Sequence, residues 1–384
     1  MALHFSEQEL AGRRAAACAA MQEQSLDGLL ITRQESMFYL TGYDTFGYVY
    51  FQCLYLGADG DYFLLTRAPD LRQAQHTSTI EEIHIWKDVE GAEPHRELRD
   101  ILHQRGLAGK HLGVEYESYG LTAASGKKLD AALDGFVTLS DASTLVSRLR
   151  LIKSPAELAY VRKAGELGDH ALAEAQRLAR PGADEGEILA AMQAAVFAGG
   201  GDYPGNEFII GSGHDALLCR YKSGRRVLDD VDQLNLEFAG TYRHYHAAMF
   251  RTLPIGKADP LHVEYHKAAH DALLACEEAL TPGHTAGDVF DAHAKVLDAA
   301  GLADHRMNAC GYSLGTTFAP NWMDWPMLYH GNPVEMRPGM VFFIHIIIFN
   351  SDAGIAQCLG RTSIVTETGA ESLSTAGLEL FLGE

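Results

Sequence analysis

Cysteine is scarce in this sequence, and the few cysteines are scattered. None of the six forms a CxxC pair or a comparable cluster with another. Structural zinc sites and disulfide frameworks both depend on such clusters. The cysteines therefore predict neither a zinc site nor a disulfide framework.

Long hydrophobic runs are also missing. The first residues, MALHFSEQELAGRR, have no apolar stretch behind a basic start, and no later run is long and apolar enough to span a bilayer. On this ground we expect a cytoplasmic protein.

Positive charge is in the minority. The chain has 31 lysine and arginine residues against 51 aspartate and glutamate residues, which gives a formal net charge of −20. Repulsion disfavours nucleic acids and anionic membranes as partners. We expect a small zwitterionic or cationic substrate instead.

The length of 384 residues is typical of two globular domains. The first part alternates strand-like segments (GLLITR, FQCLYLG, DYFLLTR) with amphipathic helices, one of them expected from Ser6 to Glu23, which favours an α/β domain. A strong helix start follows, with Ser154 as N-cap, Pro155 in the first turn and Glu157 three residues after the cap. We place the domains at residues 1–146 and 147–384.

The second domain contains an internal repeat. Pro181 and Gly182 match Pro282 and Gly283 at an offset of 101 residues. Each copy predicts two helices followed by a strand. We expect the two α-α-β copies to pack around a pseudo-two-fold axis, with a cleft between their sheets.

Several motifs together resemble the creatinase and aminopeptidase "pita-bread" family. They are KSPAEL, the paired helices with internal symmetry, Y-x-x-Y-H-x-A-x-x-R-T, GYSLGT, and RPGMVF followed by SIVTETG. The resemblance covers essentially the whole chain. It implies an α/β protein, with an α+β pita-bread C-terminal domain beside a smaller creatinase-type α/β N-terminal domain.

The metallopeptidase branch of that family holds two metal ions with two Asp, one His and two Glu. Matching by position places the following residues there: Glu237, Ala248, Tyr312, His345, and Gly360 or Leu359. Two or three of these replacements cannot supply a metal ligand. We therefore expect no metal and no cofactor.

The motif E-x-A-G-x-Y-x-x-Y-H, from Glu237 to His246, is similar to that of the family's metal-free branch, the creatinase and ectoine-hydrolase type. That resemblance implies metal-independent hydrolysis of a C–N bond in a small amidine, guanidine or cyclic amidine compound that carries a carboxylate. Where the branch has a catalytic His, this chain has Arg220. Two alternatives stay open: a metal-dependent Xaa-Pro dipeptidase or aminopeptidase that uses Glu237, His246 and His345, and a non-catalytic binding protein descended from an enzyme.

An amidinium or guanidinium carbon is electrophilic without a metal, so it needs a partner for the cation, a base for water and an acid for the departing nitrogen. Glu237 can hold the cation or attack the carbon itself. His345 and His246 are candidates for proton transfer, and Tyr312 for donation to a developing charge. Because guanidinium is not a base, Arg220 suits a carboxylate clamp, and the base role moves to His345.

Three further residues are candidates for substrate binding: Tyr242, His330 and Asp324. Structural alternatives remain for several candidates. His345 lies in the apolar stretch VFFIHIIIF and is also a reasonable core histidine. Tyr242 is also a reasonable packing residue, and Arg220 a reasonable partner in a surface ion pair.

The resemblance further implies a homodimer in which the N-terminal domain lies near the partner's active site. The aromatic run YDTFGYVYF, from Tyr43 to Phe51, is expected to be mostly strand. In such a dimer its rings would surround a bound cation.

Overall fold

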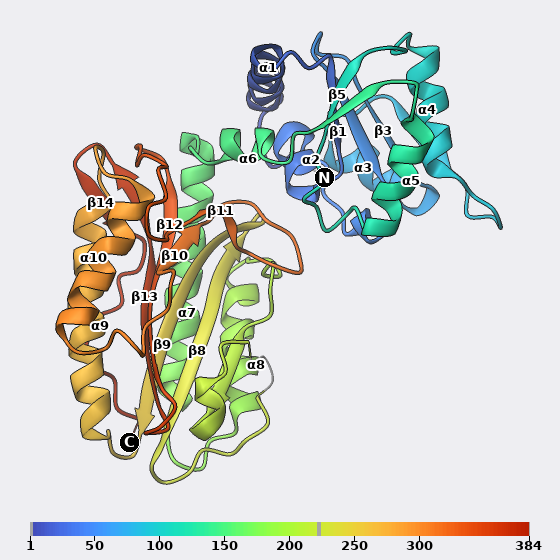
Figure 1. The fold of residues 1–384 in the computed structure, drawn as a ribbon. Helices are drawn as coiled ribbons and strands as arrows, with labels where there is room; N and C mark the ends of the chain where they lie inside the picture. The colour runs from blue at the N-terminus through green and yellow to red at the C-terminus, as the bar shows by residue number, and fades with distance from the viewer. Residues whose placement is uncertain (1–2, 221–223, 384) are drawn as a thin grey trace. The chain divides into compact units, whose positions relative to one another are not determined.

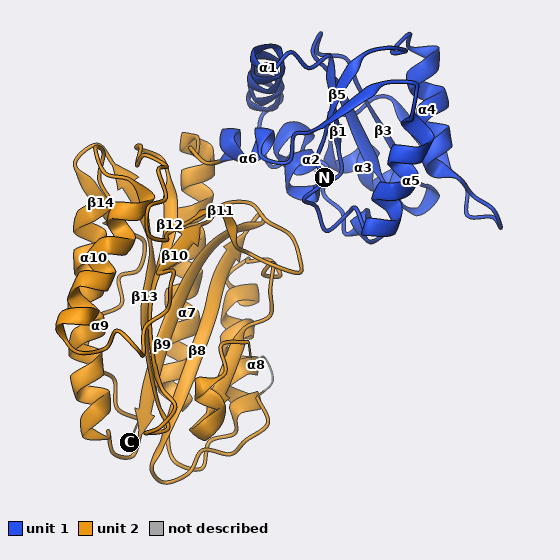
Figure 2. Cartoon of the chain, viewed as in Figure 1, with its two compact units in different colours: residues 1–150 blue, residues 151–384 orange. Residues whose placement is uncertain are grey.

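The computed structural model describes residues 3–220 and 224–383, and it divides the chain into two compact units (Figure 2). Unit 1 is Met1–Arg150 and unit 2 is Leu151–Glu384. The division follows Arg150 at the end of a short helix, slightly beyond the domain boundary expected after residue 146.

Unit 1 is built around a six-stranded sheet with the strand order β4-β3-β2-β1-β5-β6. The strands are β1 (Gly28–Ile31), β2 (Cys53–Gly57), β3 (Tyr62–Arg67), β4 (Ile83–Trp86), β5 (His111–Val114) and β6 (Thr138–Asp141). The helices are α1 (Glu7–Glu23), α2 (Gln34–Thr41), η1 (Gly47–Val49), η2 (Ala68–Asp70), α3 (Leu71–Thr77), α4 (Pro94–Gln104), α5 (Ala123–Leu133) and α6 (Leu145–Arg150). The first expected helix and the three expected strands are confirmed.

The aromatic run from Tyr43 to Phe51 is not a strand, so that prediction was wrong. It follows α2 as irregular backbone around η1. Gly42, with φ 83°, ends α2 in the left-handed conformation, which is common at helix ends and turns the chain. The aromatic residues favour a strand locally, but the turn at Gly42 places them in irregular backbone instead.

Unit 2 contains an eight-stranded sheet with the path β11-β10-β12-β13-β9-β8-β7 and β14 paired to β13 (Figure 1). Its strands are β7 (Ile209–Ser212), β8 (Asp232–Tyr242), β9 (Tyr245–Ile255), β10 (Gly311–Ser313), β11 (Asp324–Met327), β12 (Val341–Asn350), β13 (Ile355–Thr366) and β14 (Gly369–Ser372). Its helices are α7 (Pro155–Leu178), α8 (Glu185–Ala198), η3 (Gly213–Leu217), α9 (Pro260–Ala279) and α10 (Ala286–Ala299).

The internal repeat is visible in the helices of unit 2. Helices α8 and α10 both contain 14 residues, and their bounds differ by the offset that the sequence predicts. The predicted start of α7 is confirmed as well, because Ser154 and Glu157 form a reciprocal capping box.

The sequence predicts a separate sheet for each copy of the repeat, and this prediction was wrong. Strand β9 of the first copy pairs with β13 of the second, antiparallel through Phe250 and Gly360, so one sheet runs through both copies. Helix α7 packs on β8 and β9, and α9 packs on β12 and β13. All four strands therefore have one face covered by helices.

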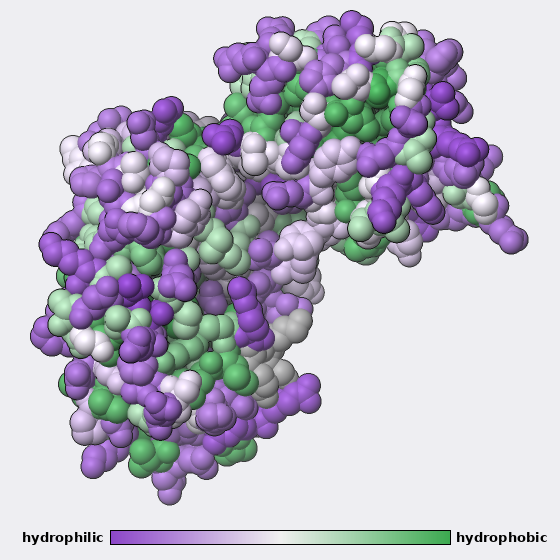
Figure 3. Space-filling model, viewed as in Figure 1, coloured by the Kyte–Doolittle hydropathy of each residue, from purple (hydrophilic) through white to green (hydrophobic). Residues whose placement is uncertain are grey.

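The surface shown in Figure 3 is mostly hydrophilic in both units, with hydrophobic side chains between the polar ones. Among the described residues, no helix combines the length and the apolar character that crossing a membrane requires.

Candidate active site

The candidate site lies on the face of the large sheet that points away from α7 and α9, called here the inner face. A β-carbon at Gly240 of β8 would lie 1.9 Å from the Ala164 carbonyl oxygen of α7, so Gly240 faces the helices. Side chains alternate along a strand, and Glu237 is three positions away, so it points to the inner face.

Strand register brings the other candidates to the same face. Glu237 pairs with Phe250, Phe250 with Gly360, and Gly360 with His345, and directly opposed residues of antiparallel strands share a face. Tyr312 reaches this face from β10, where it pairs with Phe343. Three of the four predicted catalytic residues are therefore neighbours.

A chain of hydrogen bonds orients Tyr312 toward Glu237. The Trp322 indole Nε1–H donates to the Tyr312 hydroxyl oxygen at 2.8 Å, and the Tyr312 hydroxyl donates to Glu237 Oε1 at 3.3 Å. All three side chains are buried. Because indole is only a donor, the Tyr312 proton is left for the carboxyl group.

The carboxyl group of Glu237 has an unusual acidity. Burial raises its pKa from 4.5 to about 7, although the Arg220 charge and the Tyr312 hydrogen bond both lower it. A carboxyl group with a pKa near neutral pH exchanges protons readily under ordinary conditions. Such perturbed groups cluster at functional sites.

His345 is held as a neutral imidazole. Burial, together with the smaller effect of the Arg220 charge, lowers its pKa to about 4. Its ring centroid lies 5.5 Å from that of Tyr312. Within the described part of the chain, its buried Nδ1 has no hydrogen-bond partner. A buried polar atom of this kind is expensive unless a ligand or water meets it.

Arg220 lies near the inner face although its side chain is exposed. It follows η3, and its charge acts on Glu237, Tyr312 and His345 together. This position suits a group that meets the anionic end of a bound molecule.

His246 is in a different situation from His345. Its Nε2 accepts the Gly205 backbone N–H at 2.8 Å, and its Nδ1 lies 3.4 Å from the Gly315 carbonyl oxygen and 3.3 Å from Thr317 Oγ1. Burial lowers its pKa to about 3. Both nitrogens are engaged, so His246 suits the positioning of two loops better than the proton transfer expected from the sequence.

The three predicted substrate-binding residues besides Arg220 are not brought to Glu237 by any described contact. Tyr242 lies on the helix-facing side of β8, 5.7 Å from the Tyr160 ring centroid of α7. His330 is exposed and lies 2.8 Å from Asp291 of α10. Asp324 starts β11 and accepts the backbone N–H of the next residue at 2.9 Å.

The inner face does not fit the two metal ions of the metallopeptidase branch. Ala248 opposes Ala239 and offers no donor atom. At Gly360, a β-carbon would lie 2.7 Å from the Ile344 carbonyl oxygen and 3.1 Å from the His345 α-carbon, so a Glu side chain has no room on this backbone. Among the described residues, no three His, Cys, Asp or Glu side chains are grouped to hold a metal ion.

Sequence reasoning overlooked Trp322, which is 1% exposed and fixes the Tyr312 hydroxyl. It lies in the segment NWMDWP, where attention to charged groups selects only Asp324. The composition offers a signal in hindsight, because the chain has only three tryptophans.

Comparisons with known proteins agree over the whole chain. The family model described as metallopeptidase family M24 matches residues 159–367, and that of the creatinase/prolidase N-terminal domain matches residues 13–152. An ectoine hydrolase of Halomonas elongata is 27% identical over 100% of this chain and 99% of its own length. A Xaa-Pro dipeptidase of Pyrococcus furiosus is 24% identical over 94% and 97%. The crystal structure of the dipeptidase PepE of Mycobacterium ulcerans superposes with a TM-score of 0.84 at 27% identity, covering 98% and 99%.

Proposed function

The chain belongs to metallopeptidase family M24, and on that premise we propose that it is a metal-independent hydrolase of a C–N bond in a small amidine, guanidine or cyclic amidine compound that carries a carboxylate. Its two-domain fold matches that of the dipeptidase PepE, with a creatinase/prolidase-type N-terminal domain. A hydrolase of a small molecule agrees with the full-length similarity to an ectoine hydrolase.

The observation that carries the proposal is that this site lacks the family's metal ligands at two positions and contains a buried carboxyl group whose pKa is near neutral. Glu237 is buried with a pKa of about 7 beside Tyr312 and His345, while Ala248 and Gly360 provide no ligand. A cationic substrate brings its own electrophilic carbon, so the chemistry that a metal would supply is not required.

In the proposed reaction, ionised Glu237 pairs with the cationic amidinium. Glu237 then accepts a proton from the attacking water, whose oxygen bonds to the amidinium carbon. The proton passes from Glu237 to the departing nitrogen as the C–N bond breaks. The proton left on the new hydroxyl group then moves to the released amine. The products are an amide, or a urea from a guanidine, and a protonated amine, so atoms and charge balance. Direct attack by Glu237 on the same carbon remains the other route.

The neighbours of Glu237 have separate roles in this proposal. Tyr312 stabilises the ionised carboxyl group through its hydrogen bond. Neutral His345 offers its Nδ1, which has no partner among the described residues, to the water or to the leaving nitrogen. With a pKa of about 4 it is a weaker base than Glu237, so the base role moves from His345 to Glu237. Arg220 binds the substrate carboxylate.

The metal-dependent dipeptidase alternative fits these residues less well. It requires Glu237, His246 and His345 as ligands, but the Nε2 of His246 already accepts a backbone N–H. A ligand nitrogen needs its lone pair for the metal.

The proposal is tested by offering the purified protein ectoine, creatine and proline dipeptides, each with wild type and Glu237→Gln. We expect hydrolysis of a carboxylate-bearing amidine or guanidine compound and its loss by about 10³-fold or more in the variant. Cleavage of proline dipeptides alone would contradict the proposal. Tight binding of the same compounds without turnover would instead support a non-catalytic binding protein.

A further inference from the structure

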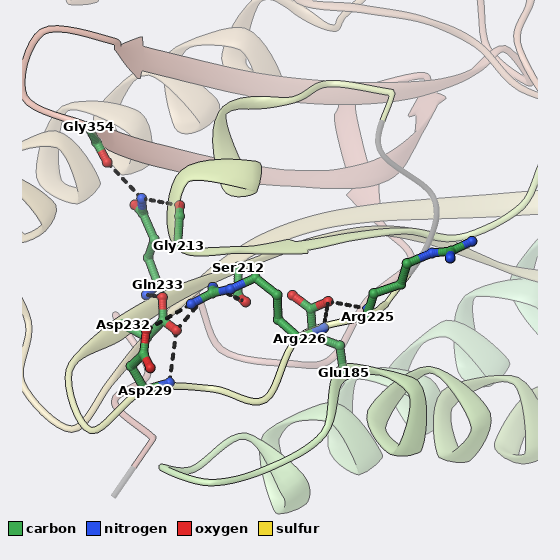
Figure 4. Close-up of polar contacts among 9 residues, drawn as sticks. All are labelled: Glu185, Ser212, Gly213, Arg225, Arg226, Asp229, Asp232, Gln233 and Gly354. Carbon is green, nitrogen blue, oxygen red and sulfur yellow. Dashed lines mark hydrogen bonds and ion pairs between the residues drawn. The ribbon is translucent and has the colours of Figure 1, made fainter.

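A buried glutamate outside the candidate site holds the backbone of two residues that follow Arg220 in the chain, Arg225 and Arg226. Glu185, the first residue of α8, is 0% exposed. Its Oε2 accepts the backbone N–H of Arg225 at 2.8 Å and that of Arg226 at 3.0 Å (Figure 4). Its own backbone N–H donates to the Arg226 carbonyl oxygen at 2.9 Å.

The contact is close enough to require a glycine. A β-carbon at Gly224 would lie 2.9 Å from the carbonyl carbon and from Cβ of Glu185. The backbone around Gly224 is therefore seated directly on the start of α8.

The Arg226 side chain extends this anchor to the sheet. Its Nη1 lies 2.5 Å from Ser212 Oγ at the end of β7 and 3.3 Å from Asp232 Oδ2 at the start of β8. Its Nη2 lies 2.8 Å from Asp229 Oδ2. One guanidinium thus joins the strand before Arg220 to the strand after it, as Figure 4 shows.

The residues that precede Arg220 are anchored from β8. Gln233 Nε2 donates to the Gly213 carbonyl oxygen at 2.8 Å, and Asn235 Nδ2 donates to the Ala216 carbonyl oxygen at 3.1 Å. Arg220 follows these residues and precedes those that Glu185 holds. The described anchors therefore lie on both sides of Arg220 in the chain.

The second copy of the repeat makes the corresponding connection without a carboxyl group. The residue equivalent to Glu185 at the start of α10 is Ala286. Its backbone N–H donates to the Val334 carbonyl oxygen at 2.8 Å, and a bridge joins Thr285 to Glu335 as another joins Asp184 to Val227. The same helix-to-loop connection therefore forms with alanine.

Helix capping does not explain Glu185 either. Asp184 caps α8, accepting the Gly186 backbone N–H at 2.8 Å. Moreover, Glu185 Oε1 is buried with no hydrogen-bond partner in the described part of the chain, which costs stability. A buried carboxyl group kept at a cost, where alanine suffices in the other copy, indicates a role beyond folding.

We infer that Glu185 is a positioning residue for Arg220, and that it sets how tightly the enzyme binds the carboxylate of its substrate. The inference rests on the proposed function for the identity of the ligand. The placement itself can be measured without turnover.

The direct readout is the alkylation rate of Cys219, which is half-buried and adjacent to Arg220. The measurement uses the full chain with Cys18, the other half-buried cysteine, changed to serine. Losing two hydrogen bonds to a buried acceptor is expected to raise the rate in Glu185→Ala by about tenfold or more. Glu185→Gln keeps an acceptor oxygen and is expected to stay within about twofold of the parent protein.

The matched control is Asp288→Ala, which removes the capping box of α10 in the second copy and leaves Glu185 intact. It is expected to leave the Cys219 rate within about twofold. If Glu185→Ala does not fold, Arg226→Met tests the same anchor and is expected to raise the rate as well. An unchanged rate in folded Glu185→Ala or Arg226→Met, or an equal rise in Asp288→Ala, would overturn the inference.

Kinetics separate positioning from general destabilisation. In Glu185→Ala we expect the KM for a carboxylate-bearing substrate to rise about tenfold with a smaller change in kcat, and Glu185→Gln to rescue it. An unchanged KM would overturn the inference. The two proposals can also fail separately. If the wild type hydrolyses no carboxylate-bearing substrate but Cys219 still reacts faster in Glu185→Ala, the positioning role of Glu185 is supported and only the proposed function is contradicted.

Discussion

At the scale of single residues, the acidity of Glu237 depends on its burial and on two residues that the fold brings near it, Tyr312 and Arg220. Burial raises its pKa, while Tyr312 and Arg220 lower it. The position of an acid in a strand is readable from the alternation of apolar residues, but its pKa depends on what the fold packs against it.

The pH dependence of stability tests this acidity. The pKa of Glu237 rises from 4.5 to about 7 on folding, so the folded protein holds the extra proton between these values, and stability falls as the pH rises through them. Glu237→Gln removes that loss. We expect it to stabilise the protein by on the order of 3 kcal/mol at pH 8.5 and by little at pH 5.

The measurement is thermal or denaturant unfolding of both proteins at the two pH values. A stability difference that does not change with pH would mean that Glu237 titrates normally in the folded protein.

Tyr312 offers a second test at the residue scale. Its hydrogen bond lowers the pKa of Glu237, so Tyr312→Phe is expected to move the acid limb of the kcat/KM profile to higher pH. The same change leaves the Trp322 indole N–H buried without its acceptor, at a cost of about 1–3 kcal/mol in unfolding free energy. Tyr242→Phe makes the same substitution on the other face of β8 and should shift neither quantity.

The neighbours of Glu237 were predicted better by matching motif positions than by choosing residues for their chemistry. Tyr312 and His345 were found because matching by motif placed them at former ligand positions, and both reach the inner face. His246 has the right chemistry, but its two nitrogens are used by loops that only the folded chain brings together. His330 instead contacts Asp291 of α10, a contact that no local sequence pattern reveals.

At the scale of elements, the sequence predicted helix ends but did not predict how the strands of the large sheet pair. Capping residues and Pro-Gly pairs mark helix ends locally, so the start of α7 and the offset between α8 and α10 followed from the sequence. The pairing of β9 with β13 joins residues more than 100 positions apart and fuses the two copies into one sheet. Such long-range pairing leaves no mark in either strand.

The packing of α7 on β8 makes a sharp prediction. Gly240→Ala would place a β-carbon 1.9 Å from the Ala164 carbonyl oxygen and 2.4 Å from the Gly168 backbone nitrogen. We expect a loss of about 3 kcal/mol in unfolding free energy, because backbone on both sides must move. Denaturant unfolding checks this.

Gly126→Ala in α5 is the control for that substitution. Its nearest neighbours lie 3.9 Å away, and alanine favours a helix, so we expect stability to rise by up to about 1 kcal/mol. Similar losses for both variants would mean that α7 does not lie against Gly240 as described.

At the scale of the whole molecule, each unit has its own hydrophobic core, and the net charge of −20 favours a cationic or zwitterionic ligand. We propose that the chain forms a homodimer. Unit 1 exposes Phe46, Val49 and Tyr50, at 79%, 61% and 51% of their surfaces. Exposed apolar residues gathered in one segment commonly mark an interface.

Sedimentation equilibrium tests this proposal. We expect twice the chain mass of 41.9 kDa for the wild type, and Phe46→Asp to weaken the dimer and raise the KM. A wild-type monomer at micromolar concentration would contradict it.

We propose that Glu237 performs the catalysis that the metal centre performs in the metallopeptidases of the family. A single kinetic measurement tests this proposal. The measurement is the initial rate of C–N hydrolysis by chelator-treated protein, before and after adding stoichiometric Zn²⁺, Mn²⁺ or Co²⁺. We predict full activity without metal and no gain from any of the three ions. A rate that is negligible after chelation and returns with one or two equivalents of metal would contradict it.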